Sequence, residues 1–279
     1  MSEYGIIIIS RDRTEMLQKT LPAWEQQEIP ILIMTEKAQV PAYRIEARRI
    51  LGRRTDVGVI GHPEDNKGVG YARESAVNFA DAFGVKAFIM ADDDTIVTKG
   101  SVRSLLDFVA KERGIVCAGW MPNYGLWLPD GNRLAKQPGL VIPRGASPDR
   151  VFALNTALVR AAGNFNPQLT TLDTQEVNRR GIRSGYMWYV HTSVHLRMLN
   201  KPHDPGGIQA LARTAEERAR QNQVDHEITY KEWGERYISH PSKRMATKWR
   251  LLASDFIGEH AAEALRDCRV YPEDSEELP

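Results

Sequence analysis

Short apolar runs rich in β-branched residues alternate with helix-like stretches through the first 120 residues of the chain. The runs that predict strands are 4–9, 31–34, 57–60, 86–90 and 115–118. Between them, apolar spacing predicts helices from Thr14 through Leu21 and over residues 44–54, 71–83 and 101–112. This alternation is typical of a doubly wound α/β fold, with a mostly parallel sheet flanked by helices.

The second half of the chain is less regular. Residues 120–147 are rich in Gly, Pro and aromatic residues and predict an irregular excursion or a small hairpin. A strand-like pattern returns at 151–159, a short helix is expected at 174–180, and residues 186–190 favour a strand. From Ile208 the chain becomes helical and highly charged. We therefore divide it into an α/β domain, residues 1–207, and a helical C-terminal extension, residues 208–279, with an acidic tail.

Composition excludes several classes of protein. The chain has 279 residues and a net charge of +1, so overall charge does not indicate a polyanionic partner. Two cysteines cannot build a disulfide framework. No apolar run approaches the roughly 20 residues that span a bilayer. We expect a soluble, cytoplasmic protein without a membrane partner.

Polar residues follow several of the predicted strands. Ser10 and Arg11 follow the first, Glu36 follows the second, and Asp92-Asp93-Asp94 follow the fourth. Ligands of doubly wound sheets bind at the carboxyl ends of the strands. The sequence therefore predicts a ligand site at this edge.

The three adjacent aspartates indicate a metal site. Neighbouring carboxylates repel one another unless a cation neutralises them, and Mg²⁺ or Mn²⁺ prefers carboxylate oxygens and phosphates as ligands. The spacing lets Asp94 reach the metal while Asp92 or Asp93 faces a ribose. Helix capping is the alternative, but residues 95–100 separate the acids from the next predicted helix.

A second motif, Lys67-Gly-Val-Gly-Tyr-Ala-Arg73, opens the third predicted helix. Gly68 and Gly70 allow close backbone approach, and Arg73 in the first helical turn can reach back to the sheet edge. A simple tight turn is the alternative. The motif lacks the full dinucleotide fingerprint and the phosphate-loop lysine pattern.

Together, these motifs resemble the nucleotide-sugar-binding half of GT-A glycosyltransferases. Residues 68–73 with Met90-Ala91-Asp92-Asp93-Asp94 look most like the TET-associated glycosyltransferases, many of them phage-encoded, which are thought to glycosylate hydroxylated pyrimidines in DNA. The resemblance covers about residues 4–207. It implies a GT-A-like mixed sheet, a UDP-type sugar donor, Mn²⁺ or Mg²⁺ at an Asp-x-Asp motif, and hexosyltransferase activity, in the host cytoplasm if the protein is phage-encoded.

The resemblance also implies roles for individual residues. The donor would be bound by Ser10, Arg11, Glu36, Lys67, Arg73, Asp92, Asp93 and Trp120. Among these, Ser10, Arg11 and Glu36 would border the nucleobase and ribose. Trp120 would face the sugar or the acceptor, although a core position is equally compatible with its sequence context. The metal would be bound by Asp94, Asp92 and a late histidine, for which His203 is preferred and His191 and His195 are alternatives.

The segment from Gly163 to Glu176 resembles the region that supplies the catalytic base in GT-A enzymes. Asp173 is the first candidate and Glu176 the second, and a spacing of three lets both face one side of a helix. The sequence departs from the common Glu-Asp pair, because Leu172 precedes Asp173. Helix capping by Asp173 is the alternative.

Residues 236–250 contain five basic residues and no acid, with Tyr237 and Trp249 interleaved. We expect DNA phosphates to contact Lys243, Arg244, Lys248 and Arg250. The preferred acceptor is then 5-hydroxymethylpyrimidine in DNA, flipped out of the duplex where necessary. A solvated helical face is the alternative for this segment. Alternatives for the chain are a saccharide, lipid or metabolite acceptor, nucleotidyl transfer, or a non-catalytic nucleic-acid-binding module.

Overall fold

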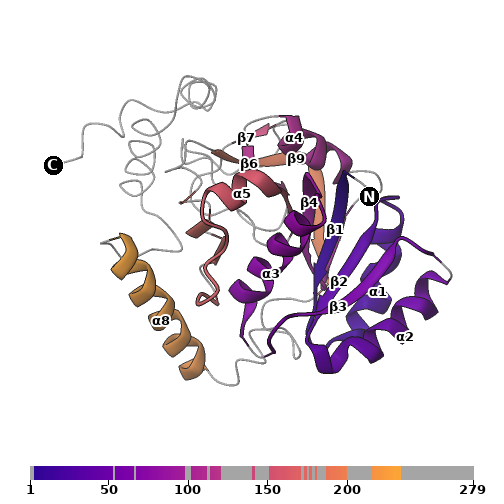
Figure 1. Ribbon diagram of the computed structural model, residues 1–279, viewed down its shortest axis with the longest axis horizontal. Coiled ribbons are helices and arrows are strands. Elements are labelled where there is room, and N and C mark those ends of the chain that lie inside the picture. Colours follow the sequence, from indigo (N-terminus) through magenta and orange to yellow (C-terminus); the bar gives the residue numbers. More distant parts are fainter. Residues whose placement is uncertain are drawn as a thin grey trace.

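The computed structural model describes residues 3–52, 54–65, 67–97, 102–111, 114–120, 140–141, 151–170, 173–174, 176–177, 180, 187–199 and 215–233. Within these residues a mixed β-sheet forms the centre of the molecule, with helices on both faces (Figure 1). The predicted fold class is confirmed.

One half of the sheet is parallel. Its strands run in the order β3 (Val57–Gly61), β2 (Ile31–Thr35), β1 (Tyr4–Ile9) and β4 (Ala87–Asp92). β1 and β2 are rich in isoleucine and largely buried, as expected for strands covered on both sides. Because the chain moves outward from β1 to β3 and returns to β4 on the other side of β1, the strand order reverses between β1 and β4.

The other half contains antiparallel pairs. β8 (Val151–Asn155) runs antiparallel to both β4 and β6 (Gly114–Trp120). β9 (Met187–Met198) is parallel to β6 and antiparallel to β5 (Thr95–Val97) and β7 (Leu140–Val141). The chain that follows the three aspartates therefore rejoins the sheet as β5, which pairs with β9.

Helices cover the two faces of the sheet. α1 (Thr14–Glu25), α2 (Val40–Leu51) and α4 (Val102–Lys111) bury their apolar side chains in one core with Ile6 and Ile8 of β1. α3 (Val69–Ala82) and the short α5 (Thr156–Ala161) contact each other on the opposite face (Figure 1). A 3-10 turn, η1 (Lys37–Gln39), connects β2 to α2.

Several element boundaries differ from the sequence-based expectation. Residues 95–97 form β5, where a connection was expected, because a distant strand, β9, supplies their hydrogen bonds. The strand expected over 151–159 ends at Asn155, whose side chain accepts the Leu158 N–H and caps α5. α2 begins at Val40 with Pro41 in its first turn. α1 begins at Thr14 as expected but continues to Glu25, beyond the predicted Leu21.

The helix α8 (Ala215–Trp233) belongs to the predicted extension of residues 208–279. It lies beside the segment that follows α5 (Figure 1), and its Asp225 and Glu232 accept hydrogen bonds from Thr170 and Arg180. In the described part of the chain, no helix is long and apolar enough to cross a membrane.

Candidate active site

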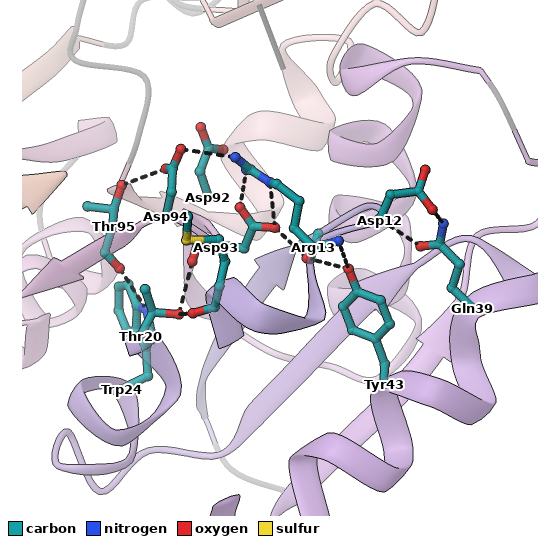
Figure 2. Close-up of polar contacts among 12 residues, drawn as sticks. Asp12, Arg13, Thr20, Trp24, Gln39, Tyr43, Asp92, Asp93, Asp94 and Thr95 are labelled. Carbon is teal, nitrogen blue, oxygen red and sulfur yellow. Dashed lines mark hydrogen bonds and ion pairs between the residues drawn. The ribbon is translucent and has the colours of Figure 1, made fainter. Parts of the chain in front are cut away.

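The carboxyl ends of β1 and β4 meet where the strand order reverses. Ile9 and Asp92 are partners in the parallel ladder, so the residues after Ile9 lie beside the three aspartates. Such a reversal point is the expected ligand crevice of a doubly wound sheet. Figure 2 shows Asp92 and Asp94 directed to the same side of the strand end, while Asp93 faces Arg13.

Asp93 is fully buried and is held by Arg13, a residue that the sequence-based interpretation did not single out. The Arg13 guanidinium donates from Nη2 to Asp93 Oδ1 and from Nε to Oδ2 at 3.3 Å. Ser10 Oγ donates to Asp93 Oδ2 and lies 2.7 Å from the Tyr43 hydroxyl. Burial raises the pKa of Asp93 to about 7, against the opposing effects of Arg13 and Ser10.

Arg13 also approaches the next aspartate, with Nη1 3.4 Å from Asp94 Oδ2. The backbone of the turn is fixed as well, because Thr20 Oγ1 donates to the Asp93 carbonyl at 2.9 Å and Trp24 Nε1 to the Thr95 carbonyl at 3.1 Å. In the sequence, Arg13 is one of two arginines that follow Ser10. Their spacing does not indicate which of Arg11 and Arg13 binds Asp93.

Arg73 links the acidic turn to the candidate catalytic base. Its Nη1 donates to Asp173 Oδ2 at 2.6 Å and to Thr174 Oγ1, while Nη2 lies 3.4 Å from Asp92 Oδ1. The guanidinium also stacks over the Phe152 ring, 5.4 Å from its centroid. All three charged side chains are buried. Asp92 and Asp173, 81 positions apart in the chain, therefore meet on one guanidinium.

Gly68 and Gly70 of the second motif pack against the chain segment of residues 166–170. Gly70 N–H donates to the Leu169 carbonyl at 3.0 Å. A Cβ at Gly70 would lie 2.4 Å from the carbonyl oxygens of Asn166 and Leu169, so only glycine fits. Gly68 precedes the helix with a φ of +93°, which favours glycine. The predicted close backbone approach is present, and its partner is the segment that leads to Asp173.

Arg11 and Glu36, both assigned to the nucleobase and ribose side, form an ion pair at 3.1 Å across the ends of β1 and β2. His62 follows β3 and is buried, and its backbone N–H donates to the Thr35 carbonyl at the end of β2. Burial lowers the pKa of His62, which favours the neutral imidazole. Lys67 is exposed and pairs with Glu64 at 3.0 Å.

The two candidate bases have different partners. Asp173 contacts Arg73, whereas Glu176 accepts a hydrogen bond from Arg180 Nε. Arg180 also donates to Glu232 Oε1 of α8 at 2.9 Å. Burial raises the pKa of Glu176 to about 7, and the neighbouring Glu232 adds to the rise. Asp173, not Glu176, is thus connected to the acidic turn.

Asp92 and Asp94 offer the carboxylate oxygens that a hard divalent cation prefers. Their contacts with Arg73 and Arg13, at 3.4 Å each, are longer than the Arg73–Asp173 bond. Among the described residues, no group of three or more His, Cys, Asp or Glu could by itself hold a metal ion. These two carboxylates therefore fit a metal whose other ligands come from a donor diphosphate, from water or from elsewhere in the chain.

Several predicted site residues lie outside the described part of the chain. They are His203 and the four basic residues Lys243, Arg244, Lys248 and Arg250. The backbone of Trp120 ends β6, and His191 and His195 lie in β9, but the side chains of these three residues are not described.

Comparison with known proteins identifies a related family for the N-terminal part of the chain. Residues 4–107, which include β1 to β4 and both motifs, match the family model of the TET-associated glycosyltransferases. This N-terminal part of the chain is that of a glycosyltransferase. No curated protein matches the sequence.

Solved structures of glycosyltransferases share the fold. S. aureus TarS 1-349 in complex with UDP-GlcNAc superimposes with a TM-score of 0.52 and 12% identity, over 84% of this chain and 73% of that chain. GalNAc-T7 with UDP, GalNAc and Mn²⁺ gives a TM-score of 0.52 and 12% identity, over 99% of this chain and 56% of that chain. At these identities the likeness establishes the GT-A fold of this glycosyltransferase and no more.

Replacing Arg13 by methionine should destabilise the protein by about 3–5 kcal/mol, because Asp93 is then left buried without its countercharge. The half-exposed Arg11 provides the control, since Arg11→Met removes the ion pairs of an exposed guanidinium with Asp12 and Glu36 and should cost less than about 1 kcal/mol. Urea unfolding measures both. The double variant Arg13→Met/Asp93→Asn should recover much of the loss. Equally small losses for Arg13→Met and Arg11→Met would contradict this account of Asp93.

The raised pKa of Glu176 predicts a pH-dependent stability. The folded state holds the Glu176 proton up to about pH 7, whereas an unfolded chain releases it near 4.5. The contribution of Glu176 to the unfolding free energy should therefore fall as pH rises from about 4.5 to about 7, by at most about 3 kcal/mol, and then level off. Glu176→Gln mimics the protonated form and should be more stable than the wild type at pH 8.

The advantage of Glu176→Gln should shrink as the pH approaches 4.5, and Glu227→Gln, on the exposed side of α8, should show no such trend. Thermal unfolding across this pH range tests the point. A difference between Glu176→Gln and wild type that does not vary with pH would show that Glu176 is ionised in the folded protein.

Proposed function

We propose that this glycosyltransferase moves a hexose from a UDP-type nucleotide sugar to a hydroxyl group, with 5-hydroxymethylpyrimidine in DNA as the acceptor. The observation that carries the proposal is the connection between Asp92 and Asp173 through Arg73 at the carboxyl ends of the strands. A donor-side acid and an acceptor-side acid are thereby held together in one buried network.

On the donor side, we assign Asp94 and Asp92 to a Mn²⁺ or Mg²⁺ ion. When bound, the metal supplies positive charge that stabilises the leaving diphosphate. The shared direction of the two side chains supports this assignment (Figure 2). Leu199 N–H donates to the Asp94 carbonyl at 2.8 Å, so the chain enters the segment with His203 next to the acidic turn, which supports His203 as a further ligand.

The Arg11–Glu36 pair at the ends of β1 and β2 suits the nucleobase and ribose, with Ser10 acting indirectly through Asp93. The UDP-GlcNAc bound to TarS and the UDP and Mn²⁺ bound to GalNAc-T7 support a UDP-type donor and a metal for this chain by analogy of fold. Lys67 and Trp120 complete the proposed donor contacts.

On the acceptor side, we assign Asp173 as the general base. Its carboxylate takes the proton from the attacking hydroxyl as the bond from that oxygen to the anomeric carbon forms. The bond from the anomeric carbon to the diphosphate oxygen breaks in the same process, and the nucleoside diphosphate leaves with the electron pair. Arg73 holds the base in place at 2.6 Å. Glu176, turned toward Arg180, is the weaker candidate.

DNA as the acceptor rests on the family match of residues 4–107 and on the basic segment 236–250. We propose that the extension of residues 208–279 contributes the DNA contacts and that the reaction takes place in the cytoplasm, where DNA and nucleotide sugars meet. A saccharide, lipid or metabolite acceptor is the second candidate, because the described site by itself selects only a hydroxyl.

Transfer should require the acidic turn. Incubation with UDP-sugars, Mn²⁺ and hydroxymethylated DNA should release UDP and give glycosylated base, detected by mass spectrometry of nucleosides. Asp94→Asn should lower kcat at least about a hundredfold, while Asp81→Asn, a surface aspartate paired with Arg160, should leave kcat unchanged. Pyrophosphate release with nucleotide incorporation would instead indicate nucleotidyl transfer, and full activity in a chelator would exclude the metal.

DNA binding should depend on the basic segment and on salt. Charge reversal at Lys243 and Arg244 should weaken binding of duplex DNA by at least about tenfold at low salt and reduce the dependence of log Kd on log salt concentration. Turnover of the same donors with water as acceptor should be unchanged. Wild-type DNA affinity in the reversed variant would remove this segment from the acceptor site and favour the small-molecule acceptor.

A further inference from the structure

α8 is docked with its polar side inward. Asp225 and Thr229 are 0% and 2% exposed, while Val224 and Tyr230 are 40% and 54% exposed. A helix held by the hydrophobic effect would show the opposite pattern. Among the described residues of α8, specific hydrogen bonds therefore contribute to holding the helix in place.

The main docking contact is between Asp225 and Thr170. The Asp225 carboxylate accepts the Thr170 N–H at 3.0 Å and the Thr170 hydroxyl at 3.3 Å, and Gln221 donates to its second oxygen at 3.2 Å. Hydrogen bonds to an ionised acceptor are stronger and more directional than neutral ones. Thr170 stands three positions before Asp173.

On the side away from α8, residues 166–170 contact the start of α3. The Leu169 carbonyl accepts the Gly70 N–H, and the Thr170 methyl group lies 3.1 Å from where a Cβ of Gly68 would be. Thr170 thus lies between the start of α3 and Asp225 of α8, and Asn166 and Leu169 pack on Gly70. The segment has little room to move unless one of these two helices moves.

A second contact of α8 lies beyond Asp173. Glu232 accepts a hydrogen bond from Arg180, which also donates to the Gly163 carbonyl at 3.1 Å. Asp225 and Glu232 are seven positions apart, so they lie two turns apart on one side of α8. The helix therefore holds the chain on both sides of Asp173.

We propose that α8 is a positioning element for Asp173, with Asp225 as its principal positioning residue. The inference rests on the proposed role of Asp173 as the base. Arg73 fixes the carboxylate of Asp173 from the side of the acidic turn, and Asp225 fixes the backbone that carries it. α8 lies outside residues 4–107, so this function belongs to the part of the chain beyond the family match.

The test compares Asp225→Ala with Glu227→Ala, an exposed residue of the same helix. Misplacing a catalytic group by about 1 Å can cost on the order of a hundredfold in rate. Asp225→Ala should lower kcat for transfer on the order of tenfold to a hundredfold and leave donor Kd, measured by calorimetry, within about twofold. Asp225→Asn, which keeps an acceptor for the Thr170 N–H, should recover most of the rate. Glu227→Ala should behave as wild type.

Two further measurements separate positioning from general destabilisation. In an Asp173→Asn background, Asp225→Ala should cause no additional loss of kcat, because the group that it positions is already gone. Amide exchange at Thr170 should be faster in Asp225→Ala than in Glu227→Ala. If Asp225→Ala does not fold, Glu232→Ala at the partly exposed contact should give a smaller loss of kcat with unchanged donor Kd.

Failure of this inference and failure of the proposed function look different. A wild-type kcat in Asp225→Ala, together with a large loss in Asp173→Asn, overturns the role of α8 and leaves the function intact. A wild-type kcat in Asp173→Asn removes the proposed base, and the inference with it. Unchanged Thr170 exchange in Asp225→Ala overturns the docking contact even if no donor is turned over.

Discussion

Two buried guanidinium groups compensate the carboxylates at the end of β4. Arg13 binds Asp93 and approaches Asp94, and Arg73 approaches Asp92 while it binds Asp173. A buried carboxylate without a partner is strongly destabilising. The arrangement of the strand ends therefore depends on where β1 and α3 place these two arginines.

Because of these arginine contacts, the three aspartates differ in their structural environment. Asp93 is fully buried and ties β4 to β1 through Arg13 and Ser10. Asp92 and Asp94 are directed to the other side and have longer contacts with their arginines, so they suit a ligand. A divalent cation with a diphosphate would thus meet two carboxylates that the protein has already set in place, which lowers the cost of organising the site on binding.

The second half of the chain contributes Asp173 to the group of charged residues around the acidic turn. Asp173 contacts Arg73 beside the acidic turn, and the segment that leads to it packs on Gly70 and bonds to Asp225 of α8. The buried Asp225 of α8 accepts the Thr170 N–H, and this directional hydrogen bond favours one position of the helix. Asp92 and Asp173 are brought together on Arg73 by parts of the chain that are far apart in sequence.

The sequence by itself determined the alternating strands and helices of residues 4–120, the glycosyltransferase resemblance and the acidic run, because these depend on local periodicity and short motifs. Only the tertiary structure decided that Arg13 rather than Arg11 binds Asp93, that Arg73 joins Asp92 to Asp173, and that residues 95–97 form a strand. Each of these depends on a partner more than 15 positions away in the chain. Local patterns carry no information about such pairs, which are fixed by burial and by the need to satisfy every buried charge and hydrogen bond.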